Sequence, residues 1–334
     1  VAQAARYYFN RDLDTLSKKE MLALVVLVRA PSRFDLWKNS NKIDRLINRL
    51  TKQLITHNLI TKQDQEFIQK EEFELEAPNL SINAPEFVKY VKNHKSLSNA
   101  NWPNIKTTLD SNLQNAVQTM LDNRLAHLST QNVYNGAVLA VEHTTGEILV
   151  WAVAGKKDTN TPGRFIDAVT SPRQPGSALK PFLYSLALNK GWSTATIIDD
   201  SLLTESVGNG LHSYQNYSRN FHGPIPLRQA LGNSLNIPAL KALNYVGVEN
   251  YLNYLHDFEF KGLNRHPNFY GDGIALGNGE VTLYELVQAY TVFANQGRLQ
   301  PLTPFPALEN SKKILNSEIA SLIGNILSDP AARA

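Results

Sequence analysis

Apolar residues recur at helical spacing through residues 1 to about 75. In SKKEMLALVVLVRAP, Ser17 and Glu20 have the spacing of a capping box, and Pro31 ends the apolar run. The segment NKIDRLINRLTKQLI then places five apolar side chains on one helical face: Ile43, Leu46, Ile47, Leu50 and Leu54. A polar, acidic helix over TKQDQEFIQKEEF follows. The pattern predicts an all-helical N-terminal part.

The pattern changes at about Ala77 and again after Pro103. Between these positions the chain is rich in Pro, Asn and Ser, which predicts a linker. The next segment, TTLDSNLQNAVQTMLDNRLAHL, predicts an amphipathic helix with one apolar face: Leu109, Leu113, Val117, Leu121, Leu125 and Leu128. GAVLAVEHTTGEILVWAV contains two β-rich runs joined by a turn at Gly146, which is typical of an antiparallel hairpin. Beyond it we expect mostly helices and loops.

The composition is that of a globular protein with sizeable cores. The 334 residues suffice for two domains at roughly 150 residues each, and 43% are hydrophobic against 19% charged. A net charge of +3 without a dense Lys/Arg block argues against nucleic acid as the main partner. The absence of cysteine excludes disulfides and a cysteine nucleophile, and the eight histidines are scattered, so we expect no metal.

Neither end of the chain looks like a natural terminus. The chain starts on VAQAARYYF without a methionine and stops on SDPAARA, so we expect both ends to be cuts through a longer protein. The longest apolar run near the start, Met21 to Val28, is far short of the ~20 residues that a membrane-spanning helix needs. We therefore expect any membrane anchor to lie upstream of Val1.

The stretch RQPGSALKPF carries the main candidate chemistry. Pro181 has no N–H and fits a helix only in its first turn, so the helix SALKPFLYSLALNKG is predicted to begin at about Ser177. Lys180, three residues on, shares a helical face with Ser177. A lysine whose pKa is lowered by burial can take the proton of a serine hydroxyl and make the serine a nucleophile. On these two residues alone, an ordinary N-cap followed by a surface lysine is the alternative.

A Ser-x-Asn pattern occurs three times, and context distinguishes the three serines. Ser81 lies in the linker and Ser218 in the loop YQNYSRNFHGP, whereas Ser234 lies between helical runs in LGNSLNIPALKAL. A hydroxyl at Ser234 is suited to relay a proton between Lys180 and a leaving group, and the Asn236 amide to hold a substrate carbonyl. The alternative is a polar corner between two helices.

Three segments together resemble the transpeptidase domain of class A penicillin-binding proteins, of the 1C type in particular: RQPGSALKPFLYSLAL, YQNYSRNFHGPIPLRQALGNSLNIPAL and ALGNGEVTLYELVQAYTVFANQG. TTLDSNLQNAV and the hairpin match the start of that domain, and YYFNRDLDTLSKKEMLALVVLVRAPS resembles the tail of a family 51 glycosyltransferase domain. The resemblance implies an α+β fold in three parts. An all-α glycosyltransferase tail (1–76) and a linker (77–106) precede a transpeptidase domain (107–334) of antiparallel sheet and helices, truncated before its C-terminal strands.

The resemblance also implies residue roles, substrates and a location. Ser177 would be the acylated nucleophile, Lys180 its base, and Ser234 and Asn236 the second, Ser-x-Asn motif. The reaction would be D-Ala-D-Ala transpeptidation or carboxypeptidation of peptidoglycan stem peptides, without a cofactor and blocked by β-lactams. The parent protein would also be a glycosyltransferase, anchored in the inner membrane and facing the periplasm.

Two family motifs are missing from this sequence. The third transpeptidase motif, Lys-Thr-Gly, does not occur, and KTT at Lys106 precedes the serine; we expect the motif beyond Ala334. The glycosyltransferase glutamates are expected before Val1. The chain alone is therefore expected to be inactive in both reactions.

Other function classes fit the residues less well. ENYLN, which starts at Glu249, imitates the deacylation motif of class A β-lactamases but follows Ser234 too soon. A β-lactam sensor would share the acylation residues without a glycosyltransferase tail, and a non-catalytic scaffold would be expected to have lost Ser177 or Lys180. GDGIALGNG, from Gly271 to Gly279, lacks the spacing of a nucleotide-binding loop and is predicted to be a loop before a helix.

Overall fold

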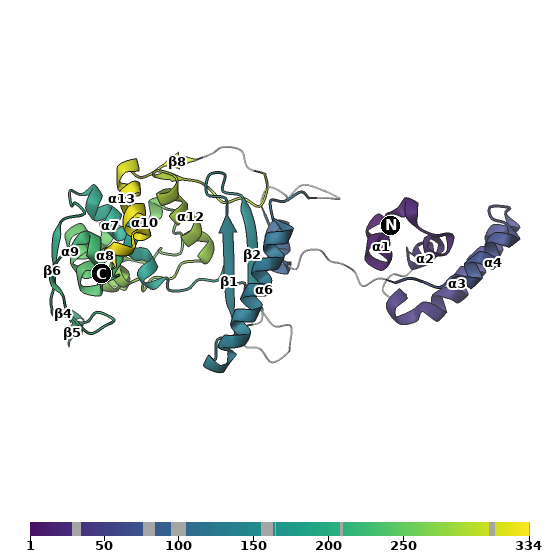
Figure 1. Cartoon of the computed structure of the whole chain (residues 1–334), viewed down its shortest axis with the longest axis horizontal. Coiled ribbons are helices and arrows are strands. Elements are labelled where there is room, and N and C mark those ends of the chain that lie inside the picture. The colour runs from purple at the N-terminus through teal and green to yellow at the C-terminus, as the bar shows by residue number, and fades with distance from the viewer. Residues whose placement is uncertain are drawn as a thin grey trace. The chain divides into compact units, whose positions relative to one another are not determined.

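The computed structural model describes residues 1–28, 35–75, 84–94, 105–154, 163, 165–207, 210–306 and 311–333. The chain divides into two compact units, residues 1–81 and 82–334, whose elements are labelled in Figure 1.

The first unit is all helical, as predicted. It contains α1 (Ala2–Phe9), a 3₁₀ turn (Leu13–Thr15), α2 (Lys18–Val28), α3 (Leu36–Thr56) and α4 (Lys62–Lys70). The predicted capping box starts α2, because Ser17 N donates to Glu20 Oε2 at 2.8 Å and Glu20 N donates to Ser17 Oγ at 3.1 Å. On α3, Ile43 and Ile47 are buried, and the other three residues of the predicted face are half-buried. The predicted stop at Pro31 lies outside the described residues.

Part of the predicted linker is a helix instead. Within 77–106, α5 spans Pro85–Lys92 and begins with proline in its first turn. Phe87 and Val91, one helical turn apart, are buried and pack in a cluster with Trp151. The flanks of this short apolar stripe are rich in Pro and Asn, which is why the composition predicted a linker. Helix α5 belongs to the second unit rather than to a spacer.

The second unit combines short antiparallel strand pairs with helices. Its α-helices in the described residues are, besides α5, α6 (Ser111–Leu128), α7 (Lys180–Asn189), α8 (Leu227–Gly232), α9 (Asn236–Val246), α10 (Val248–Asp257), α11 (Pro267–Tyr270), α12 (Leu283–Ala294) and α13 (Ser317–Ser328). The pairs are β1 (Gly136–Val141) with β2 (Ile148–Ala154), β3 (Ile197–Asp200) with β6 (Gly223–Pro226), β4 (Leu203–Val207) with β5 (Gly210–Tyr214), and β7 (Arg298–Leu299) with β8 (Lys312–Lys313).

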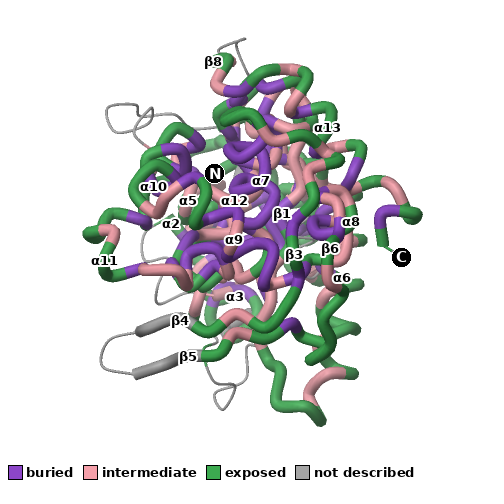
Figure 2. Tube along the Cα trace, turned by 90° about the vertical axis from the view of Figure 1, so that its left-hand side faces the viewer, coloured by how far each residue is buried: buried purple, intermediate pink, exposed green. Residues whose placement is uncertain are grey.

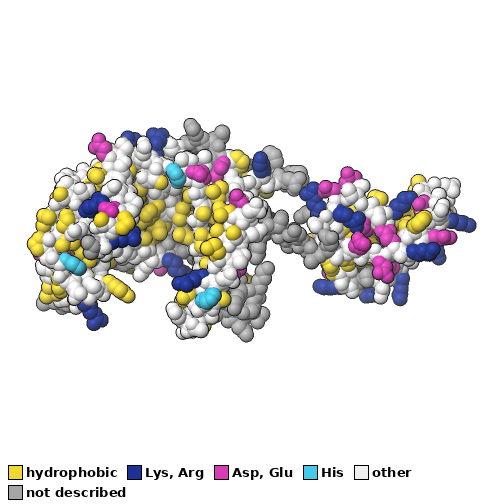
Figure 3. Space-filling model, in the orientation of Figure 1, with side chains coloured by type: hydrophobic (Ala, Val, Ile, Leu, Met, Phe, Trp, Pro, Cys, Tyr) yellow, Lys and Arg dark blue, Asp and Glu magenta, His cyan; other side chains and the backbone are white. Residues whose placement is uncertain are grey.

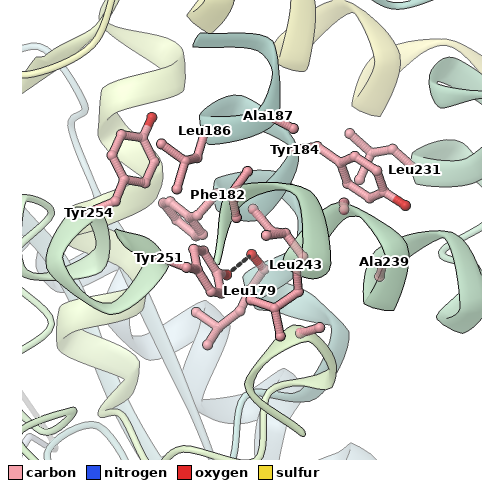
Figure 4. Packing of buried hydrophobic residues seen from close by; sticks show 14 of the residues in the cluster. Leu179, Phe182, Tyr184, Leu186, Ala187, Leu231, Ala239, Leu243, Tyr251 and Tyr254 are labelled. Atoms are coloured by element: carbon pink, nitrogen blue, oxygen red, sulfur yellow. Dashed lines mark hydrogen bonds between the residues drawn. The ribbon is translucent and has the colours of Figure 1, made fainter. Parts of the chain in front are cut away.

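Helix α7 is the centre of the helical core. Every residue of α7 except Asn189 is buried, and Figure 2 shows this helix as a buried segment among α9, α12 and α8. Phe182 packs edge-to-face against Phe258, Phe260 and Tyr290. Figure 4 shows Phe182 among other buried residues of this core, including Leu186 and Tyr251. A helix buried on all sides is a rigid base for the residues at its N-terminus.

The predicted hairpin is confirmed, but α6 meets it through polar side chains. Figure 1 shows α6 lying along β2 on the side away from β1. Gln114, fully buried, accepts from Trp151 N at 2.9 Å and donates to Trp151 O at 3.1 Å, and Gln118 Nε2 donates to Val153 O at 3.3 Å. Leu113 of the predicted apolar face is 40% exposed. The helix prediction is confirmed, and the other five residues of the predicted apolar face are half-buried. The buried positions of α6 are nevertheless Gln114 and Gln118, because the unpaired backbone of an edge strand needs hydrogen-bond partners.

The opposite edge of the hairpin is open within the described part of the chain. The backbone groups of Ala137, Leu139 and Val141 point away from β2, and they make no hydrogen bond to any residue that the structure describes. This edge has the geometry to accept a further strand.

Candidate active site

The predicted nucleophile, Ser177, lies in a 3₁₀ turn just before α7. Gly176–Leu179 form a 3₁₀ turn that leads directly into α7, and Pro181 lies in the first turn of that helix. The predicted helix start at Ser177 is confirmed within this turn. Ser177 is exposed, whereas Lys180 is only 1% exposed.

Two tyrosine hydroxyls and a glycine support this turn from behind. Tyr251 donates to Leu179 O at 2.8 Å, as Figure 4 shows, and Tyr290 donates to Ala178 O at 2.9 Å. Gly277 has φ +78°, and a Cβ built on it would lie 2.1 Å from Gly176 O. The stretch GDGIALGNG is thus a 3₁₀ turn and loop before α12, as predicted, and its Gly277 allows the backbone to approach the Ser177 turn closely.

Lys180 reaches the second predicted motif. Its Nζ donates to Ser234 O at 2.5 Å, to Asn236 Oδ1 at 2.8 Å and to Ser234 Oγ at 3.3 Å. Burial lowers the pKa of Lys180 to about 8, because a charged amine is poorly solvated inside the protein. The structure therefore brings Lys180, Ser234 and Asn236 together, with Ser177 three residues before the lysine. In the described part of the chain the Ser177 hydroxyl makes no hydrogen bond.

The Ser-x-Asn motif lies between two helices and has an unusual backbone. α8 ends at Gly232 and α9 begins at Asn236, while Ser234 has φ 54°. A left-handed residue other than glycine costs about 1–3 kcal/mol, and such residues cluster at functional sites. The polar corner that sequence analysis named as the alternative is present, and its polar atoms face Lys180.

Ser218, in the second Ser-x-Asn pattern, makes no hydrogen bond to Lys180. Ser218 lies in an exposed loop, where its Oγ accepts from Asn220 N at 3.3 Å, and Ser81 lies outside the described residues. Glu249 is exposed at the start of α10 and makes no described contact with this group. The feature of ENYLN that reaches the site is Tyr251, through its contact with Leu179.

Sequence analysis missed the buried polar residues behind α9. Asp200 and Asn216 are buried and hydrogen-bonded to each other, and Asn216 Oδ1 accepts from Asn236 N at 2.8 Å. Asn216 belongs to the loop YQNYSRNFHGP, whose Ser-x-Asn pattern points to Ser218 and not to Asn216. Nothing in the local pattern marks Asp200, because the contact joins residues far apart in the sequence.

Metal and membrane features are absent from the described part of the chain. Among those residues, no cluster of three or more His, Cys, Asp or Glu could hold a metal ion. None of the described helices combines the length and apolar character of a membrane span. On the face that Figure 3 shows, the described Lys and Arg side chains are interspersed with Asp and Glu and form no continuous basic surface.

Comparison with known families agrees with this geometry. The family model for the penicillin binding protein transpeptidase domain matches residues 136–327, and the transglycosylase model matches residues 1–55. The chain belongs to the penicillin-binding protein transpeptidase family. The matched range includes Ser177, Lys180, Ser234 and Asn236, and the two matches together confirm the resemblance to class A penicillin-binding proteins.

Individual relatives are matched along most of this chain. Penicillin-binding protein 1C of Escherichia coli is 30% identical, covering 99% of this chain and 42% of that protein. Penicillin-binding protein 4 of Bacillus subtilis is 25% identical, and the match covers 90% of this chain and 52% of that protein. Our chain thus spans about half the length of these relatives.

The crystal structure of penicillin-binding protein 1A from Haemophilus influenzae has the same fold. It superposes with a TM-score of 0.71 at 19% identity, covering 98% of this chain and 69% of that one. The predicted fold class, an all-α part followed by an α+β transpeptidase domain, is confirmed.

Proposed function

We propose that this chain is part of a bifunctional cell-wall synthase that cross-links peptidoglycan stem peptides through an acyl ester on Ser177. The transglycosylase and transpeptidase matches support the two activities. The observation that carries the proposal is the buried amine of Lys180, held by Ser234 and Asn236 one helical turn after an exposed serine.

The hydrogen bonds of Lys180 suit a neutral amine that acts as a base. A neutral amine has two N–H groups and one lone pair. In the neutral amine the two shortest contacts, to Ser234 O and Asn236 Oδ1, would use the two N–H groups, and Nζ would no longer donate across the 3.3 Å contact to Ser234 Oγ. The lone pair would then be left to accept the proton of Ser177. With a pKa of about 8, about a tenth of the lysine is neutral at pH 7.

The proposed reaction then follows in two steps. Ser177 Oγ attacks the carbonyl carbon of the penultimate D-Ala, and its proton passes to Lys180 Nζ. When the C–N bond breaks, the terminal D-Ala leaves with a proton that Lys180 returns through the Ser234 hydroxyl. An amine of a neighbouring stem peptide, or water, attacks the ester carbonyl carbon and gives up a proton to neutral Lys180. Lys180 returns this proton to Ser177 Oγ as the ester C–O bond breaks. The Ser177 N–H is proposed as half of the oxyanion hole, and Asn236 as a contact for the substrate carbonyl.

A β-lactam would follow only the first step. Ring opening breaks the amide bond, but the leaving nitrogen stays tethered to the acyl group, so the ester persists and blocks the site. The proposed partners are therefore stem peptides and β-lactams, with no cofactor and no nucleic acid. We place the parent protein at the periplasmic side of the inner membrane, held by an N-terminal anchor. The glycosyltransferase tail would end near residue 81, and the transpeptidase domain would begin before α5 rather than at residue 107.

We also propose that residues 1–334 alone are acylated slowly and transfer no glycan. The sequence has no Lys-Thr-Gly, whose cation would hold the substrate carboxylate, and the open edge of β1 offers a place for a further strand. An active chain of residues 1–334 would contradict this part of the proposal.

Labelling with a fluorescent penicillin tests the acylation step. In the full-length protein, Ser177→Ala is expected to abolish the fluorescent band, whereas Ser218→Ala, in the exposed loop, should label like the wild type. Equal labelling of Ser177→Ala and wild type would refute the nucleophile assignment. Release of the label within minutes would instead favour the alternative of a serine β-lactamase-like hydrolase, and stable labelling without cross-linking would favour a sensor.

A further inference from the structure

A buried carboxylate–amide pair lies behind the N-terminus of α9. Asp200, the last residue of β3, is 0% exposed, and Asn216, in the loop after β5, is 3% exposed. Asn216 Nδ2 donates to Asp200 Oδ1 at 2.8 Å and Oδ2 at 2.9 Å, and to Asn220 O at 3.0 Å. His222 donates its backbone N–H to Asp200 Oδ2 at 3.0 Å, and its Nδ1 lies 2.8 Å from the same oxygen. The carboxylate thus fixes which way the Asn216 amide points.

The other end of the Asn216 amide caps α9. Its Oδ1 accepts from Asn236 N at 2.8 Å and from Ile237 N at 3.3 Å. The first N–H groups of a helix have no partner inside the helix and are usually satisfied by the N-cap side chain. The N-cap residue here is Leu235, which has no polar side-chain atom. Asn216 supplies the cap from a different segment.

The same loop also orients the Asn236 side chain. Asn236 Nδ2 donates to Gln215 O at 2.9 Å, so its Oδ1 is left to face Lys180 Nζ at 2.8 Å. The backbone and the side chain of Asn236 are therefore both held by residues 215 and 216. A chain of hydrogen bonds runs from Asp200 through Asn216 to Asn236 and ends at Lys180.

We propose that Asp200 and Asn216 are positioning residues for the acylation of Ser177. They hold the start of α9 so that Asn236 and Ser234 keep Lys180 in a dry, fixed place. This inference rests on the proposed function, because it concerns the base of that reaction. The Asp200 carboxylate is fully buried, and its contacts are the Asn216 amide and the backbone N–H and ring of His222. Burying a carboxylate is costly, so the orientation that it imposes on Asn216 accounts for it better than stability does.

The test compares acylation rates between variants of the buried Asp200 and Asn216 and a variant of the exposed Asp199, all in the full-length protein. Asn216→Ala removes the cap, and Asp200→Asn keeps the size and one acceptor of the carboxylate. The matched control is Asp199→Asn, the preceding residue of β3, whose carboxylate is 52% exposed and pairs with Lys241 of α9. For each variant, the rate of acylation by a fluorescent penicillin is measured from pH 6 to 9, together with a thermal melt.

We expect Asn216→Ala to slow acylation by about ten- to a hundredfold, the size typical of a misplaced catalytic group. Its pH midpoint should move upward, because water reaches Lys180 and favours the charged amine. Asp200→Asn should show a smaller shift in the same direction. The double variant should be no slower than Asn216→Ala alone, since the two residues act in series. Asp199→Asn should stay within about twofold of the wild type, as expected for an exposed pair.

A purely structural role would lower the melting temperature without moving the pH midpoint, and that result in Asn216→Ala would overturn the inference. If Asn216→Ala does not fold, Asp200→Asn decides: wild-type rate and midpoint in that variant overturn the inference as well. Ser177→Ala is labelled in parallel. Labelling that persists there refutes the proposed function itself, whereas its loss beside unchanged Asp200 and Asn216 variants refutes only the positioning role.

Discussion

The pH dependence of acylation follows from the burial of Lys180. Only the neutral amine can take a proton from Ser177, so the rate should follow the neutral fraction. Lowering the pKa from 10.5 to about 8 raises that fraction at pH 7.5 from about a thousandth to about a quarter, equivalent to about 3 kcal/mol. The direction of the pH effect follows: the acylation rate should be low at low pH and rise as Lys180 loses its proton.

The assay is the second-order rate of acylation by a fluorescent penicillin between pH 6 and 9. Below pH 7 we expect about a tenfold rise for each pH unit, and from pH 8 to 9 a further rise of only about twofold as the rate levels off, because the titration of one group sets the profile. The full-length protein is the sample, and Ser177→Ala gives the background. A rate that does not change from pH 6 to 9 would refute the assignment of Lys180 as the base.

Lys180→Arg separates the base from the charge. Arginine keeps a positive charge but does not deprotonate in this pH range, so acylation should fall by at least about a hundredfold at every pH. The control is Lys241→Arg on α9, where the lysine pairs with Asp199 at the surface and arginine can replace it. Near-normal acylation in Lys180→Arg would show that another group takes the proton.

Three further substitutions test how the site is supported. Gly277→Ala forces a left-handed alanine and a Cβ 2.1 Å from Gly176 O, so we expect a loss of about 2 kcal/mol or more and slower acylation; unchanged melting and rate would contradict the close approach. Tyr251→Phe leaves a buried carbonyl of the Ser177 turn without its donor and should cost about 1–3 kcal/mol in a thermal melt; a melt like the wild type would show that the bond is dispensable. Gln114→Leu leaves the backbone N–H and C=O of Trp151 unpaired, so the free energy of unfolding measured by chemical denaturation should fall by about 2–4 kcal/mol, although leucine is the more apolar residue. A more stable variant would refute the explanation of the buried Gln114 at the edge of β2.

Local patterns were enough to predict the elements that carry the chemistry. The position of Pro181 fixed the start of α7 and placed Lys180 one turn after Ser177, because proline limits a helix locally. Alternation of apolar residues gave the β1–β2 hairpin, and capping-box spacing gave the start of α2. The position of Ser234 between helical runs favoured it over Ser218 as the partner of Lys180, and the resemblance supplied the same assignment as the family's second motif.

The contacts that support the site were not predictable in this way. Asp200 and Asn216 meet only after the chain has folded, and an isolated aspartate or asparagine has no periodic signal. The buried glutamine Gln114 contradicts the rule that polar residues lie outside, since it replaces a strand partner rather than filling a core. Such features depend on which backbone groups remain unpaired after folding, and a one-dimensional pattern does not record that.

Peptide mapping of the acyl-enzyme tests the central claim most directly. The full-length protein is incubated with a D-Ala-D-Ala ester substrate, quenched in acid, digested with trypsin and analysed by mass spectrometry. Trypsin is expected to leave Gln174 to Lys190 as one peptide, since it cuts after Arg173 but not before Pro181. Our account predicts the mass of the acyl group on this peptide, at Ser177, and none in Ser177→Ala. An acyl group on any other residue of the wild-type protein would contradict it.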